Sequence, residues 1–197
     1  YKEVFIEFFN KCKELNTDYI VIGGDIFHTK TQGITPEVID ELSWFFTKCS
    51  ETCKTYVLLG NHDGNLRNLG RQDAISPIIN ALNLTNLVLL KDTKSIEIED
   101  NVHIHAYSCF DTKAWKKIKP INNDINIALF HGSVGNAITD TGFMLEPDVD
   151  ITFFNGHDYV LLGDIHKHQF LTSDKRIAYP GSPIPQNYSE IDSKGFL

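Results

Sequence analysis

The first half of the chain alternates between apolar patterns of two periods. Residues 4–15 place apolar side chains at helical spacing, whereas residues 19–22 form a short β-branched run typical of a buried strand. A second helix is predicted over residues 36–53, with a proline in its first turn. A second buried strand is expected at residues 56–59 and a third helix at residues 73–82. This alternation favours layers of helices and strands.

The second half is more strand-like and contains one long polar segment. Residues 132–150 include glycine, lack a clear period and are expected to form a long surface loop. Neither an internal repeat nor an interdomain linker is visible, so residues 1–197 are interpreted as one α/β domain that binds ligands at the carboxyl ends of its strands. The strands expected here cover residues 87–90, 95–98, 102–107, 125–130, 159–162 and 176–179.

Composition narrows the class of protein. Of the 197 residues, 42% are hydrophobic, yet no apolar run approaches the roughly 18 residues of a membrane helix, so no membrane association is expected. The four cysteines form no CxxC pair and are interpreted as reduced thiols of a cytoplasmic protein. The net charge of −8 argues against a broad basic face for nucleic acid, but acidic side chains suit an enzyme that binds phosphate through metal ions.

Four of the predicted strands end in side chains that bind metal ions. A glycine beside the polar residue provides a tight turn. If the strands share one sheet, these side chains meet at one edge. They are Asp25 after the first strand, Asn61, His62 and Asp63 after the second, His131 after a third, and Asp164 and His166 after a fourth.

Hydrolysis of a phosphate ester explains these residue types. Oxygen-preferring ions such as Mn²⁺ accept carboxylate, amide oxygen and imidazole. Two ions about 3.5–4 Å apart can hold the attacking water and the leaving oxygen of a phosphoryl centre, and a histidine outside the ligand set can protonate the leaving group. The pattern therefore predicts two divalent ions, with Mn²⁺ expected and Mg²⁺ or another transition metal as alternatives.

The motifs GGDIFH, GNHD, FHG and GDIH, in this order, resemble the motif series of the calcineurin-like metallophosphoesterases. Within that superfamily the chain is most similar to SbcD-type DNA repair exonucleases, including phage and viral relatives, on the segments RQDAISP, GDIHKHQ and YPGSPIPQ. The resemblance covers nearly the whole chain. It implies a layered α/β/β/α sandwich and metal-dependent nuclease chemistry.

The resemblance also implies a role for each strand-end residue. Asp25 is expected to bridge the two ions, and His166 to bind the first. His62 is the expected catalytic imidazole, which Asp63 would orient. Many relatives have histidine where this chain has an aspartate at position 164, but a carboxylate still suits a manganese-type ion. The expected ligands of the second ion are Asn61, His131 and Asp164.

One departure concerns the beginning of the family pattern. Relatives start with a strand ending in Asp-x-His, which supplies two ligands to the first ion, and this sequence has no such motif before its first residue. Only Asp25 and His166 remain for that ion, so the first site is expected to fill weakly or not at all. We interpret residues 1–197 as a fragment of a metallophosphoesterase nuclease domain, incomplete at the N-terminus.

The leading hypothesis is Mn²⁺-dependent hydrolysis of DNA phosphodiesters by an exonuclease or endonuclease subunit of DNA repair. The resemblance implies an SbcC-type ATPase partner and is compatible with a homodimer. A small-molecule phosphoesterase of the same superfamily is an alternative, which the acidic net charge favours. A weakly catalytic binding subunit is a third interpretation, supported by the incomplete first site.

Other residues have plainer interpretations. His103 and His105 alternate on one strand and are expected to have surface or packing roles. The lysines around Trp115 form either a solvated helix face or a contact to the DNA backbone with an aromatic platform. Residues left as structural, or as contacts at the rim of the site, are His28, His157, His168 and the turn at residues 179–183.

Overall fold

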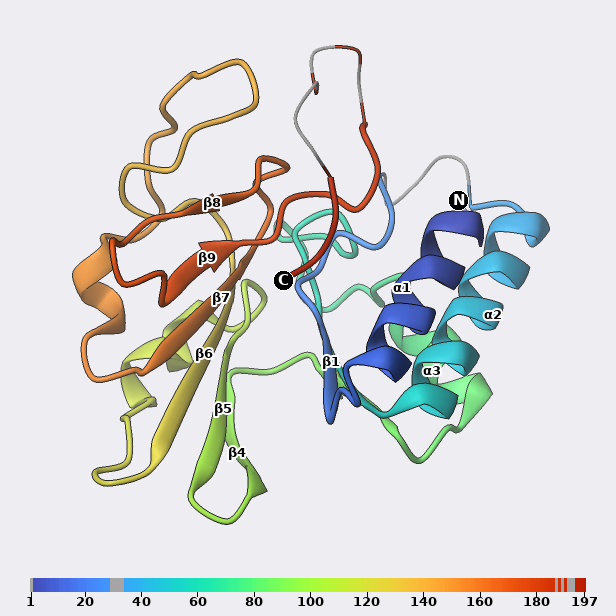
Figure 1. Cartoon of the computed structure of the whole chain (residues 1–197), viewed down its shortest axis with the longest axis horizontal. Coiled ribbons are helices and arrows are strands. Elements are labelled where there is room, and N and C mark those ends of the chain that lie inside the picture. The colour runs from blue at the N-terminus through green and yellow to red at the C-terminus, as the bar shows by residue number, and fades with distance from the viewer. Residues whose placement is uncertain (1, 29–33, 187, 189, 191–193) are drawn as a thin grey trace. The chain divides into compact units, whose positions relative to one another are not determined.

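The computed structural model describes residues 2–28, 34–186, 188, 190 and 194–197, and the chain divides into two compact units, residues 1–91 and 92–197 (Figure 1). Both units contain a sheet with helical segments, so the predicted α/β class is confirmed. Within the described residues, no helix is both long enough and apolar enough to cross a membrane.

The first unit is built on the parallel strands β1 (Tyr19–Ile22), β2 (Lys54–Leu58) and β3 (Leu87–Leu90), which lie in that order. Tyr56 pairs with Val21 on one side and with Val88 on the other. Because all three strands run the same way, the loops that follow β1 and β2 leave the sheet at the same edge. The strand predictions for this unit are confirmed to within two residues.

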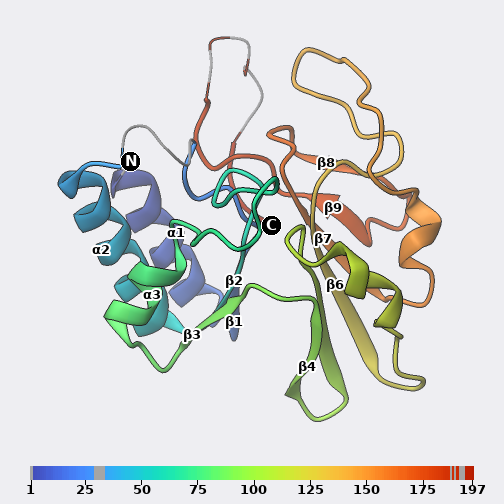
Figure 2. The same ribbon diagram turned by 180° about the vertical axis from the view of Figure 1, so that it is seen from behind.

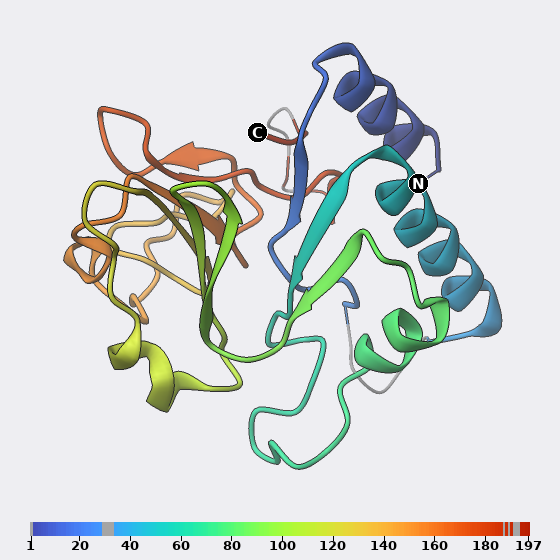
Figure 3. The same cartoon turned by 90° about the horizontal axis from the view of Figure 1, so that it is seen from below.

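Helices α1 (Lys2–Glu14), α2 (Pro36–Thr52) and α3 (Ser76–Leu82) lie on one side of this sheet (Figure 3). Apolar side chains of α1, α2 and β1 form a shared core. Thr35 caps α2, since its hydroxyl accepts the backbone N–H of Val38 at 3.5 Å. The buried members of the core are Phe9, Cys12, Ile20 and Cys49.

The prediction that the third helix begins at Asp73 is wrong. Oδ1 of Asp73 accepts the backbone N–H groups of Ile75 and Ser76, at 3.0 and 2.6 Å, so Asp73 precedes the helix and satisfies its first donors. Its Oδ2 forms an ion pair of 2.8 Å with Lys91, just after β3. Within the RQDAISP segment, Asp73 therefore stabilises the start of α3 and connects it to the end of β3.

The second unit contains a mixed sheet in the order β4-β5-β6-β7-β9-β8. Strands β5, β6, β7 and β9 are parallel, whereas β4 and β8 pair antiparallel at the two edges (Figures 1 and 2). Buried side chains of β6, β7 and β9 form the main core. The bounds are β4 (Lys94–Glu99), β5 (Val102–Tyr107), β6 (Ile125–His131), β7 (Tyr159–Gly163), β8 (Gln169–Phe170) and β9 (Ile177–Tyr179).

The expectation of a surface loop over residues 132–150 is wrong in part. Val134 and Ala137 are buried in the main core. Oδ2 of Asp148 accepts the backbone N–H of Ser133 at 2.8 Å, and Val134 pairs with Val149 in an isolated bridge. These contacts tie the two ends of the segment together, and its most continuous exposed stretch is residues 141–144.

Two short 3₁₀ helices, η1 (Thr112–Lys117) and η2 (Ile151–Phe154), complete the unit. Trp115 of η1 donates from Nε1 to the carbonyl of Ser108 at 2.8 Å, and its ring packs edge-on against Phe130 with centroids 5.3 Å apart. The indole is partly buried and packs against the main core. The neighbouring lysines are exposed, which fits both a solvated face and a contact to the DNA backbone: Lys113, Lys116, Lys117 and Lys119.

Candidate metal centre

The predicted site residues of the first unit follow β1 and β2. Asp25 follows β1 after two glycines and has a φ of +52°, a conformation that aspartate adopts more readily than most residues. Its Oδ1 accepts the backbone N–H of His62 at 2.8 Å. The carboxylate after β1 is thus fixed to the loop after β2, which also carries Asn61.

Asp63 is the anchor of this arrangement. Its side chain is fully buried and accepts the backbone N–H groups of Ile26, Phe27 and Gly60 at 2.9, 3.1 and 2.8 Å. Three such donors to one carboxylate hold both loops in place. These contacts show that Asp63 positions the backbone around His62. That Asp63 orients the His62 imidazole remains a prediction.

The His62 imidazole is exposed and is held from the side. Its Nδ1 hydrogen-bonds to the carbonyl oxygen of His28, and the two rings stack with centroids 6.0 Å apart. A carbonyl can only accept, so Nδ1 carries a proton, and Nε2 is the ring nitrogen that this bond leaves available. His28, interpreted from the sequence as structural or as a substrate contact, thus contacts the predicted catalytic group directly.

In the second unit, two predicted ligands lie side by side. His131, the last residue of β6, pairs in register with Gly163, the last residue of β7. Asp164 follows with a φ of +89°, and its Oδ1 lies 3.7 Å from Nε2 of His131. The His131 side chain is buried, whereas that of Asp164 is 30% exposed. An imidazole nitrogen and a carboxylate oxygen at this separation suit a shared divalent ion.

The surroundings of Gly132 explain why glycine follows His131 in the FHG motif. Tyr179 donates its hydroxyl proton to the Gly132 carbonyl at 2.7 Å, which fixes the chain just after the ligand. A Cβ at position 132 would lie 2.8 Å from Oδ2 of Asp148, the atom that receives the Ser133 N–H. Only glycine leaves the room for this turn.

His166 is 44% exposed at its side chain and is held by a residue that the sequence analysis missed. Its Nδ1 lies 2.9 Å from Oε1 of Glu190. Burial opposes ionisation of Glu190, but hydrogen bonds from Gln186, His166 and Lys194 outweigh it and lower the pKa of the carboxyl to about 2. No local motif signals this pairing, because 24 residues separate the partners.

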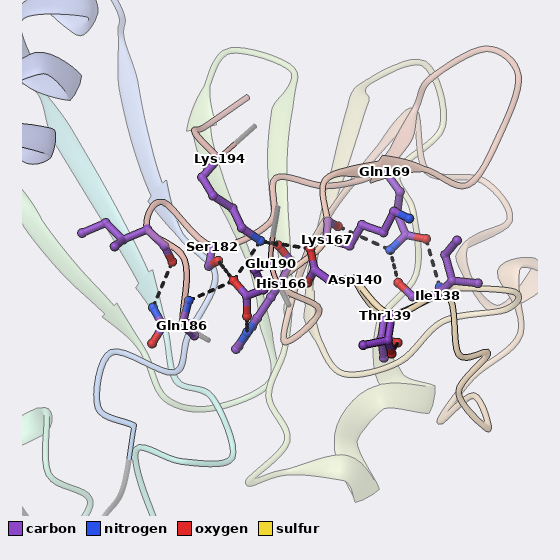
Figure 4. Close-up of polar contacts among 12 residues, drawn as sticks. Ile138, Thr139, Asp140, His166, Lys167, Gln169, Ser182, Gln186, Glu190 and Lys194 are labelled. Atoms are coloured by element: carbon purple, nitrogen blue, oxygen red, sulfur yellow. Dashed lines mark hydrogen bonds and ion pairs between the residues drawn. The ribbon is translucent and has the colours of Figure 1, made fainter. Parts of the chain in front are cut away.

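Two family-like segments support the His166 loop. The N–H of Ser182, in YPGSPIPQ, donates to the His166 carbonyl at 3.0 Å. The side-chain amide of Gln169, in GDIHKHQ, forms hydrogen bonds of 3.1 and 2.8 Å with the backbone of Ile138 (Figure 4). The first bond therefore fixes the backbone at His166, and the second joins the start of β8 to the segment after β6.

The candidate residues form two groups. Asp25, Asn61, His62 and Asp63 belong to the first unit, and His131, Asp164 and His166 to the second. The donor set is carboxylate, amide and imidazole in the first group and carboxylate and imidazole in the second, and both sets fit hard or borderline divalent ions. A separate cavity of about 370 Å³, lined in part by Trp115, Phe153 and His157, contains none of these residues. The candidate site is therefore identified by the potential metal-binding side chains at the strand ends and not by that cavity.

This combination of fold and strand-end residues defines a metal-dependent phosphoesterase. Residues 2–168 match the family described as calcineurin-like phosphoesterase, so the chain belongs to that family of hydrolases, which bind divalent metals. The predicted family is thereby confirmed.

Two viral proteins and one archaeal protein are among the relatives of the chain. The chain is 40% identical over 205 residues to protein R555 of Acanthamoeba polyphaga mimivirus, across 96% of this chain and 15% of that protein. It is 29% identical over 212 residues to “Putative phosphoesterase 244L” of Invertebrate iridescent virus 6, across 99% of this chain and 69% of that protein. It is 28% identical over 192 residues to the DNA double-strand break repair protein Mre11 of Archaeoglobus fulgidus, across 87% of this chain and 42% of that protein.

Proposed function

We propose that the chain hydrolyses phosphodiester bonds in DNA with the help of two divalent ions. The observation that carries the proposal is the pair of His131 and Asp164, whose donor atoms lie 3.7 Å apart at the ends of adjacent parallel strands. Such convergent donors at strand ends suit ligand binding in α/β sheets.

In this proposal, the ligands of the two ions are the strand-end residues that the family resemblance indicates. Asp25 would bridge the ions, and His166 would bind the first. When bound, the ions supply positive charge that stabilises the phosphoryl transition state. The remaining ligands, assigned to the second ion, are Asn61, His131 and Asp164.

His62 would handle the proton at the leaving oxygen. Its Nδ1 is held by the His28 carbonyl, so Nε2 is the atom available to the substrate. Asp63 contributes by fixing the surrounding backbone through Ile26, Phe27 and Gly60. A catalytic imidazole on a backbone held this firmly meets the need for accurate placement of the proton-transfer group.

The DNA substrate is supported by the archaeal relative, which is named as a DNA double-strand break repair protein. We extend the proposal to Mn²⁺ as the ion, to an SbcC-type ATPase as partner, to a homodimer and to an intracellular location. The last is supported by Cys12, Cys49, Cys53 and Cys109, which are thiols rather than half-cystines. A small-molecule phosphoesterase is the second candidate, favoured by the net charge of −8.

The test is a cleavage assay with Mn²⁺ on linear double-stranded DNA and on a small chromogenic phosphodiester. Asp25→Ala is the inactivating variant. Asp174→Ala is the matched control, because that carboxylate is 54% exposed and pairs only with nearby groups such as Arg176. DNA degradation that Asp25→Ala removes and Asp174→Ala retains supports the nuclease. Cleavage of the small ester alone would replace it with the second candidate.

A further inference from the structure

The Glu190 carboxylate contacts the His166 ring and is buried, unlike that of an ordinary surface glutamate. The Glu190 side chain is only 1% exposed, and Oε1 lies 2.9 Å from Nδ1 of His166 (Figure 4). The His166 ring itself is 44% exposed, so its other edge is open to a ligand. The two residues therefore form a buried carboxylate and an outward-facing imidazole.

The other carboxylate oxygen is fixed by separate donors. Oε2 of Glu190 receives the Lys194 ammonium at 2.9 Å, the backbone N–H of Gln186 at 2.9 Å and the Ser182 hydroxyl at 3.3 Å. These contacts leave Oε1 directed at the imidazole. The carboxylate cannot rotate away from His166 without losing bonds to all of these groups.

Lys194 links this carboxylate to the ligand loop a second time. Its ammonium also donates to the His166 carbonyl at 2.9 Å and to Oδ1 of Asp140 at 3.2 Å. The Lys194 side chain is 7% exposed, so its charge is balanced by Glu190 and Asp140 within the protein. Both the ring and the backbone of His166 are thus held by one buried network.

The network fixes which nitrogen of His166 carries the proton. An ionised carboxylate only accepts hydrogen bonds, so the proton between the two groups belongs to Nδ1 of the imidazole. Nε2 is then the ring nitrogen that faces away from Glu190. A metal-binding histidine requires this tautomer, and a carboxylate behind it raises its basicity as a ligand.

We propose that Glu190 is the positioning residue of His166, which selects the Nδ1–H tautomer and presents Nε2 to a divalent ion. This inference rests on the proposed function, in which His166 is a metal ligand. Lys194 supports Glu190 by holding its second oxygen. Glu190 and Lys194, which follow YPGSPIPQ, would therefore belong to the metal centre through their effect on one imidazole.

A tautomer measurement tests the inference without metal or substrate. Two-bond ¹H–¹⁵N NMR of the metal-free protein should show His166 as the Nδ1–H tautomer. Glu190→Gln, which keeps the shape of the side chain, should shift His166 toward a mixture of tautomers. Glu146→Gln, at an exposed glutamate, is the matched control and should leave the spectrum of His166 unchanged. An unchanged tautomer in Glu190→Gln would overturn the inference, whether or not the protein cleaves DNA.

A double-mutant cycle separates positioning from general support of the fold. Glu190→Gln should weaken Mn²⁺ binding by about 10- to 100-fold, as loss of a partner behind a metal-binding histidine does. In a His166→Ala background the same change should have little further effect. Equal weakening in both backgrounds would mean that Glu190 supports the fold and not His166. Absent hydrolysis with an intact cycle would instead contradict the proposed function alone.

Discussion

Asp25 and His62 are joined by a hydrogen bond of 2.8 Å from the backbone N–H of His62 to Oδ1 of Asp25. One carboxylate therefore carries both a structural bond and the charge assigned to the metal ions. Because Asp25 also holds a φ of +52°, its conformational, hydrogen-bonding and charge roles can be separated by substitution.

Asp25→Asn should leave the fold intact but reduce metal binding and hydrolysis. Asparagine tolerates a positive φ and can accept the His62 N–H, but it lacks the charge, so Mn²⁺ binding and hydrolysis should fall sharply. Asp25→Ala should lose both and also lower the free energy of unfolding by about 2–3 kcal/mol, from backbone strain and the lost hydrogen bond. Urea unfolding and metal titration measure the two effects. Full activity in Asp25→Asn would refute the assignment of Asp25 as a bridging ligand.

His62→Ala should reduce the rate of hydrolysis by about 10²- to 10⁴-fold while metal binding persists. The reason is that Nε2 of His62 is assigned to proton transfer and not to metal binding. The measurement pairs kcat with Mn²⁺ stoichiometry in the wild type and the variant. Loss of the metal together with the rate would show that His62 is a ligand.

Gly181→Ala should disturb His166. A Cβ at position 181 would lie 2.7 Å from the His166 carbonyl oxygen, and φ is +81° there. Gly142→Ala is the matched control, since φ is +78° and nothing lies within 4 Å of its added Cβ. Both variants should lose about 1–2 kcal/mol of stability through strain, but only Gly181→Ala should also weaken Mn²⁺ binding. Equal metal affinity in the two variants would exclude a role of this turn in placing His166.

The stability of the protein should fall as the pH drops below about 6.5. His105 is fully buried, with Nε2 donating to Asn126 at 2.8 Å and Nδ1 accepting from the Ser95 hydroxyl at 2.7 Å. Burial is the main cause that lowers the pKa of His105, and it also lowers that of His157. Below pH 6.5 the unfolded chain therefore binds protons at these two imidazoles that the folded chain does not bind. The stability that the neutral imidazoles contribute above pH 6.5 is lost as the pH falls through the folded pKa values.

The slope should reach about 1.4 kcal/mol per pH unit for each histidine that stays neutral. Urea unfolding between pH 7.5 and 5 measures it. His105→Gln should flatten the curve, whereas His168→Gln, at an exposed histidine, should leave it unchanged. A wild-type curve that is flat across this range would contradict the prediction.

Strand ends were predictable from the sequence because buried parallel strands are short apolar runs that stop abruptly. The runs before Asp25, Asn61, His131 and Asp164 each end where β1, β2, β6 and β7 end, to within two residues. Family resemblance added roles for these residues, and those roles remain predictions. Helix ends were less predictable, because Asp73 supplies capping bonds that helical periodicity does not reveal.

Long-range polar pairing could not be predicted. Glu190 reaches His166 across 24 residues, and nothing in the local pattern distinguishes it from a surface acid. Strand β8 covers only Gln169–Phe170, too short for a periodic signal, and is held by pairing with β9. Burial of Val134 within a polar segment likewise depends on contacts that form only in the folded chain.

The hydrogen bond from the backbone N–H of Ser133 to Asp148 has an evolutionary consequence. Because this bond closes the segment directly after His131, the exposed stretch at residues 141–144 can change in length at only a small entropic cost to the fold. Exposed Phe143 and Met144 lie in this stretch. Insertions and deletions there can diversify the surface close in sequence to the predicted ligand His131, so new specificities can evolve without a change at that residue.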